Sequence, residues 1–195
     1  MKLLFDTCVL YPTVMRAALM GACKVMGWRP MWSDRILEEW ARSARKLGPL
    51  GEDHARAEIA LLQRDWPQAC ISYPDGLEAR LYLPDPADRH VLAAAISGSA
   101  DKIVTLNNKD FPKNTLWEEG VDRIDPDRLL FDAVMENHTG MRQIADLILS
   151  EANQMSHDTW THRSLFKKAR LPKFAKAISD LDRVSLGRGY FLDRK

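Results

Sequence analysis

The stretch that decides the fold is Leu83–Phe111, which reads LPDPADRHVLAAAISGSADKIVTLNNKDF. It predicts a helix that leads into a buried strand. Asp85 before Pro86 marks the helix start, because proline at the first helical position loses nothing and a carboxylate there meets the positive end of the helix dipole. Gly98 ends the helix, and residues 103–106 form a short β-rich run. Polar side chains follow at the carboxyl end of this strand: Asn107, Asn108 and Asp110.

The amino terminus repeats this arrangement. Residues 3–5 form an apolar run that ends in Asp6, and a buried acid is unfavourable unless a positive charge neutralises it. Ligands of open α/β sheets bind at the carboxyl ends of the strands. We therefore expect Asp6 to lie close to Asn107 and Asp110, with Asp88 on a neighbouring helix start. Crowded carboxylates repel one another, which predicts a hard divalent cation with oxygen ligands.

Strands and helices alternate over the first 137 residues, which is typical of a parallel sheet covered on both faces. The expected strands are 3–5, 30–32, 69–72, 103–106 and 121–124, and the expected helices are 13–26, 34–46, 52–65, 85–98 and 125–135. From His138 onward only helical patterns occur. We expect an α/β domain over residues 1–137 and a helical C-terminal extension over residues 138–195, with a poorly ordered tail from Gly187.

Composition limits the class of protein. A hydrophobic fraction of 46% and a charged fraction of 28% are typical of a soluble protein, and a net charge of +1 argues against a globally basic nucleic-acid binder. Three cysteines without paired spacing favour a reducing compartment over a disulfide framework or a zinc site. Asp6 interrupts any signal peptide, and no apolar run approaches the roughly 20 residues of a membrane span. We therefore expect a cytoplasmic protein that does not insert in a membrane.

A basic run near the C-terminus contains no acid. It is either a solvated helical face or a surface that follows phosphates, and the sequence leaves both interpretations open. Its members are Arg163, Lys167, Lys168, Arg170, Lys173 and Lys176.

Four segments in order carry a resemblance to a known family. They are Leu4–Leu10 (LFDTCVL), Ser33–Trp40 (SDRILEEW), Asp85–Ala95 (DPADRHVLAAA) and Val104–Phe111 (VTLNNKDF). Together they resemble the PIN domain family, and in particular the longer VapC-like toxins of bacterial toxin–antitoxin systems. The resemblance covers roughly residues 1–135 and implies a three-layer α/β/α fold. One departure is Asn107, which stands where the family often has Asp and would add no charge to a metal site.

The resemblance implies a metal-dependent endoribonuclease that is held inactive by a cognate antitoxin, with RNA as its substrate. It places Asp6, Glu39 and Asp88 around one Mg²⁺ or Mn²⁺, with Asp110 as a further catalytic and metal-binding acid. Thr105 and Asn107 would support these ligands. A bound metal of this kind lowers the pKa of a water and neutralises phosphate oxygens. Whether the protein forms a homodimer is left open.

Several assignments depend on weighing two roles for one residue. Asp85 is expected to cap its helix and is left out of the ligand set. Glu39 is preferred over Glu38 because of its place in the second segment. His90 is expected at the surface or behind the ligands, since hard cations prefer oxygen. Three cations near the expected site are candidates for contact with phosphate: Arg16, Arg89 and Lys109.

Other functions compete with this interpretation. A catalytically silent PIN-fold module that binds RNA or protein would not need three acids. A structure-specific DNA nuclease of the same fold is a further alternative, although this chain offers little room for a duplex clamp. A phosphatase with an aspartate nucleophile needs a second acid two residues after Asp6, where this chain has Cys8.

Overall fold

The computed structural model describes residues 1–156 and 158–189, and it describes side-chain surroundings as far as residue 180. The chain divides into two compact units. The first contains residues 1–13 and 27–125, and the second contains residues 14–26 together with residues from 126 onward. The predicted division into residues 1–137 and 138–195 concerns which part carries the activity, and it stays a prediction.

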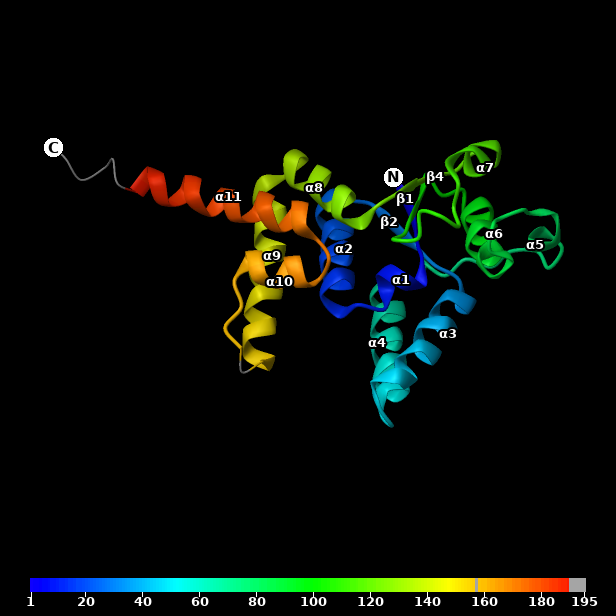
Figure 1. Ribbon diagram of the computed structural model, residues 1–195, viewed down its shortest axis with the longest axis horizontal. Coiled ribbons are helices and arrows are strands. Elements are labelled where there is room, and N and C mark those ends of the chain that lie inside the picture. Colours follow the sequence, from blue (N-terminus) through cyan, green and yellow to red (C-terminus); the bar gives the residue numbers. More distant parts are fainter. Residues whose placement is uncertain (157, 190–195) are drawn as a thin grey trace. The chain divides into compact units, whose positions relative to one another are not determined.

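The first unit is built on a parallel sheet of four strands in the order β2-β1-β3-β4. Figure 1 labels three of these strands, β1, β2 and β4. The strands are β1 (Lys2–Phe5), β2 (Arg29–Met31), β3 (Lys102–Val104) and β4 (Asp122–Ile124). Residues 3–5 of β1 and 103–104 of β3 are all apolar and fully buried, because a parallel sheet between helices has no face exposed to water. Phe5 lies opposite Val104, and the Asp6 amide donates to the Val104 carbonyl over 3.2 Å. The carboxyl ends of β1 and β3 are therefore neighbours, as predicted.

Helices flank this sheet. They are α1 (Thr7–Leu10), α3 (Asp34–Ser43), η1 (Ala44–Leu47), α4 (Gly51–Asp65), α5 (Leu77–Arg80), η2 (Pro86–Asp88), α6 (Arg89–Gly98) and α7 (Lys113–Glu118). Residues 91–95 of α6 are fully buried, since three successive alanines let this helix approach the sheet closely. The Asp85 carboxylate accepts from the Ala87 amide over 2.8 Å, which confirms the predicted cap. The central parallel sheet, flanking helices and C-terminal helices confirm the predicted α/β fold.

Three local predictions are wrong in detail. Residues 69–72 do not form a strand but make an isolated bridge between Trp32 and Cys70, because the turn at Pro67 and the proline at 74 leave too short a segment to pair. Residues 77–80, which lie in none of the expected strands or helices, form the short helix α5 (Leu77–Arg80). The helix expected to run to residue 46 ends at Ser43 and continues as the 3₁₀ helix η1.

The second unit is entirely helical in its described part. It contains α2 (Thr13–Met26), apart from its first residue, with α8 (Pro126–Glu136), α9 (His138–Met155), α10 (His162–Lys168) and α11 (Pro172–Gly189). Phe166 packs edge-on against Phe174 with ring centroids 4.8 Å apart. Gly21 in α2 lies so close to the side chain of Ile144 in α9 that a Cβ atom would overlap it. Residues 187–189 of the expected tail are helical, and residues 190–195 lie outside the described part.

The helices of the described residues also bear on membrane insertion. No helix among them combines the length and the apolar character that a membrane span requires.

The second unit depends on a buried acid. Asp127 in α8 is 5% exposed, and its two carboxylate oxygens accept from the amides of Lys173 and Phe174 over 3.0 and 2.9 Å. These amides lie in the first turn of α11, where no helical carbonyl is in reach. Asp127 therefore caps a helix that is distant in sequence.

We predict that Asp127→Ala lowers the free energy of unfolding by about 2 kcal/mol, because one buried and one partly buried amide lose their acceptor. Thermal unfolding followed by circular dichroism should show a melting temperature lower by roughly 4–8 °C. Asp132→Ala is the control, because the Asp132 side chain is 44% exposed and its ion pair with Arg128 adds little. Equal effects of the two substitutions would contradict the assignment.

Candidate functional site

Asp6 follows β1 and is 7% exposed. One of its carboxylate oxygens accepts from the Thr105 hydroxyl over 2.7 Å and from the Cys8 thiol over 3.1 Å. Burial and the nearby charge of Asp6 raise the pKa of Cys8 to about 12, so the thiol keeps its proton and donates it. The Thr105 hydroxyl also accepts from the Asn107 amide over 2.9 Å. These contacts fix the direction of the Asp6 carboxylate at the strand end.

Glu39 comes from the second half of α3. One carboxylate oxygen lies 3.0 Å from His90 Nε2, and the other accepts from the Thr7 hydroxyl over 3.2 Å. Burial alone would raise the pKa of Glu39, but the contacts with His90 and Thr7 hold it below its ordinary value. His90 is 1% exposed, so of the two places expected for it, the one behind an acid fits the structure.

Glu38 and Glu39 are neighbours in sequence but lie in different surroundings. Glu38 forms surface ion pairs with Arg42 and Arg56, at 2.8 and 3.0 Å. Glu39 lines a cavity together with Asp6. The two side chains diverge because successive residues of a helix point about 100° apart. Of the two, only Glu39 lines the acidic cavity, and its role as a ligand stays a prediction.

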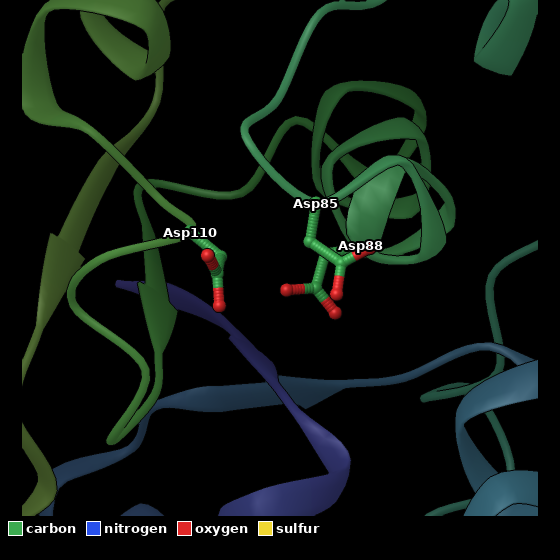
Figure 2. Close-up of side chains that lie close together, drawn as sticks. All are labelled: Asp85, Asp88 and Asp110. Atoms are coloured by element: carbon green, nitrogen blue, oxygen red, sulfur yellow. The ribbon is translucent and has the colours of Figure 1, made fainter.

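Three further acids converge beside this cavity. Ligand atoms of Asp85, Asp88 and Asp110 all lie within 4.8 Å of one another. Figure 2 shows Asp85 and Asp88 side by side at the start of a helix, with Asp110 facing them from the loop that follows β3. Asn107 Nδ2 donates to the Asp88 carboxylate over 3.2 Å. Burial and the negative charges of Asp6, Asp85 and Asp110 raise the pKa of Asp88 to about 6.

Asp88 joins the two sets of acids. The cavity has a volume of about 400 Å³, and Asp6, Glu39, Asp88 and Asn107 all line it. Asp88 also belongs to the group with Asp85 and Asp110, and the carboxylates of Asp6 and Glu39 lie outside that tight group. Asp85 was left out of the predicted ligand set. It caps its helix, as predicted, and its carboxylate also lies close to those of Asp88 and Asp110. Its position three residues before Asp88 on a helical turn was the available signal.

The donor set fits a hard divalent cation. Within residues 1–156 and 158–180, no basic side chain forms an ion pair with Asp6, Asp85, Asp88 or Asp110. The imidazole of His90 contacts Glu39 and is not part of the cavity lining, which includes three carboxylates and one amide side chain. Oxygen ligands of this kind suit Mg²⁺ and Mn²⁺. The residues that could hold such an ion are Asp6, Asp88, Glu39, Asp110 and Asp85.

The cations predicted to contact phosphate are not among the residues that line the cavity. Arg89 is the half-buried first residue of α6, and Lys109 is exposed. Arg16 is buried in α2, which belongs to the second unit, so its contact with phosphate stays a prediction. The described lining contains one cation, Lys46 of η1. Sequence reasoning missed it because it lies outside the four segments of the resemblance.

Comparisons with known proteins agree with this fold. The sequence profile described as PIN domain matches residues 2–109. Putative ribonuclease VapC50 of Mycobacterium tuberculosis (strain ATCC 25618 / H37Rv) is 33% identical over 94 residues, which cover 43% of this chain and 56% of that protein. The chain thus spans little more than half the length of this curated relative. No solved structure matches the chain.

We predict that Asp88→Asn stabilises the metal-free protein. At pH 7.5 Asp88 is ionised although its neighbours repel it, and the amide removes that repulsion while it still accepts from Asn107. For a half-buried group the gain after solvent screening is about 1 kcal/mol. In EDTA the melting temperature should rise by about 2–4 °C.

The pH dependence of this stability difference between variant and parent provides the control. Because folding raises the pKa of Asp88 to about 6, its destabilising effect is absent below the unfolded value near 4 and complete above pH 6. The variant's advantage should therefore shrink at pH 5. Asp75→Asn, at an exposed loop position, should leave stability unchanged at both pH values. A variant that is less stable than the parent at pH 7.5 would contradict the prediction.

Proposed function

Since the chain belongs to the PIN domain family, we propose that it is a metal-dependent endoribonuclease and the toxin of a toxin–antitoxin pair. The observation that carries this proposal is the acidic cavity, which Asp6, Glu39 and Asp88 line together. Among the described residues Glu39 pairs with Arg35 and His90, whereas Asp6 and Asp88 have no compensating ion pair. The name of the relative, a ribonuclease, supports RNA as the substrate class.

Asp6, Asp88, Glu39 and Asp110 would hold Mg²⁺, or Mn²⁺ in its place. A bound ion of this kind neutralises phosphate oxygens and lowers the pKa of a water to make it nucleophilic at neutral pH. The chain's own residues keep the ligands in position. Thr105 and Cys8 orient Asp6, and His90 and Thr7 orient Glu39. Such supporting contacts are as important to a metal site as the ligands themselves.

The remaining assignments concern partners and organisation. The nuclease activity would lie in residues 1–137, with residues 138–195 as a helical extension. A cavity so rich in acids also fits a basic side chain of an antitoxin, which would block it by charge complementarity. Arg89, Lys109 and Arg16 are proposed to contact the RNA backbone. We also propose a cytoplasmic location. The protein would act either as a monomer or as a homodimer.

We predict that Asp6→Asn and Glu39→Gln each lower RNA cleavage at least about 100-fold, because each removes one charge from the proposed metal site. Cleavage of a labelled single-stranded RNA in Mn²⁺ or Mg²⁺ measures this. Glu38→Gln is the matched control next to Glu39, because among the described residues Glu38 forms ion pairs only with the surface arginines Arg42 and Arg56. It should retain activity within about threefold.

A silent binding module would behave differently in the same experiment. If Asp6→Asn remained as toxic on expression as the parent protein, catalysis would not be the function. A DNA nuclease would cleave a DNA oligonucleotide of the same sequence faster than the RNA. Either result would replace the proposed function.

We predict that cleavage leaves a 5′-phosphate and a 3′-hydroxyl, because a water activated at the acidic cavity attacks rather than the ribose 2′-hydroxyl. Sequencing of 5′-phosphorylated RNA ends after brief expression measures this, with Asp6→Asn as the background. Products that end in a 2′,3′-cyclic phosphate would show attack by the 2′-hydroxyl and would contradict the mechanism.

A further inference from the structure

A second cavity of the first unit lies next to the acidic one. It has a volume of about 530 Å³, and Tyr11 lines both cavities. Trp40 of α3 forms part of its lining, together with Leu47 of η1, Leu50, and His54 of α4. The size lies within the range of small-molecule sites. The two cavities therefore share one lining residue, the aromatic Tyr11.

Two exposed leucines flank the turn at the edge of this second cavity. The side chains of Leu47 and Leu50 are 72% and 62% exposed, although full burial of a leucine is favourable by about 1.5–3 kcal/mol. The intervening Gly48 has a φ of 121°, which favours glycine. A Cβ atom at Gly51 would overlap the carbonyl of Ala44, so the turn packs closely against η1. A closely packed turn thus holds two apolar side chains in solvent, which is typical of a binding surface.

The 3₁₀ helix η1 contributes a residue to the lining of each cavity. Lys46 lines the acidic cavity, and Leu47, the next residue, lines the apolar one. In the described residues up to 180, no carboxylate lies within ion-pair distance of Lys46. A ligand that spans both cavities would meet acids, then a cation, then an apolar surface. An RNA strand has the matching order of a metal-binding phosphodiester, an anionic backbone and a flat apolar base.

We propose that the second cavity binds the unpaired nucleobase next to the cleaved bond, with Tyr11, Leu47 and Leu50 against the base and Lys46 against the adjoining phosphate. The inference rests on the proposed function and adds a subsite to it. Unpaired bases expose their flat faces, and proteins bind such faces with aromatic and apolar side chains. His54 and Glu58 add polar groups to the lining that a base edge can meet. Duplex RNA, whose bases are stacked on one another, would be excluded.

Binding of RNA tests this subsite without the need for cleavage. All proteins carry Asp6→Asn, and the probes are a short fluorescein-labelled single-stranded RNA and the same backbone without bases, measured by fluorescence anisotropy in Mn²⁺. The reference protein should bind the base-free strand about tenfold more weakly, since one stacked base contributes roughly 1–3 kcal/mol.

Leu47→Ala/Leu50→Ala removes the apolar contacts at two exposed positions, where the fold does not depend on them. This variant should bind both probes with the same weak affinity. Leu61→Ala is the matched control, because Leu61 is 52% exposed on α4 and is absent from the cavity lining. Lys46→Gln should weaken the binding of both probes equally. It should also reduce the slope of log affinity against log salt concentration by about 0.7, the value for one phosphate of a single strand.

The outcomes separate the subsite from the nuclease. Absence of RNA binding, or equal binding of both probes by the reference protein, overturns the subsite. The same holds if the double variant leaves RNA affinity unchanged and alters only the association state in size-exclusion chromatography, because the leucines then form a contact between copies. Base-dependent binding that requires the leucines, without RNA cleavage by the parent protein, supports the subsite and contradicts the proposed nuclease. RNA cleavage by the parent protein together with equal binding of both probes supports the proposed nuclease and contradicts the subsite.

Discussion

The register between β1 and β3 is the constraint on which the site depends. Phe5 lies opposite Val104 in this parallel pair. The residue that follows each of them, Asp6 after β1 and Thr105 after β3, therefore lies at the same edge of the sheet. The Thr105 hydroxyl then donates to the Asp6 carboxylate over 2.7 Å. A shift of one residue would turn every side chain of the strand to the opposite face. The buried leucines, isoleucine and valine of these strands prevent such a shift, because all of them are fully buried in this register.

The acidic site works against the stability of the fold that holds it. Asp88 has a pKa of about 6 because burial and three neighbouring carboxylates oppose its charge. Functional sites commonly contain such perturbed groups, and the rest of the structure offsets their cost. Here the offset comes from the buried sheet and from α6, whose alanines pack closely over it. Binding of a divalent cation would relieve the repulsion, so the same charges that destabilise the free protein would favour the ion.

The sequence predicted the features that depend on short runs of residues. Buried apolar runs followed by acids indicated the parallel sheet and placed Asp6 near Asn107. Asp85 was assigned only to a cap, because a capping acid and a metal-binding acid look alike in sequence. Lys46 was missed because it lies outside the four segments of the resemblance, in the 3₁₀ turn η1 where an ordinary helix was expected. The close approach of Gly21 to Ile144 joins helices far apart in the chain, and no local pattern reports such a contact.

The central claim is that side chains distant in sequence form one metal site. Crystals grown with Mn²⁺ and measured at the manganese absorption edge test it most directly. The account predicts an anomalous peak bonded to carboxylate oxygens of Asp6 and Asp88, with Glu39 or Asp110 beside it. A peak that lies elsewhere, or a cavity without a peak at saturating Mn²⁺, would contradict the claim.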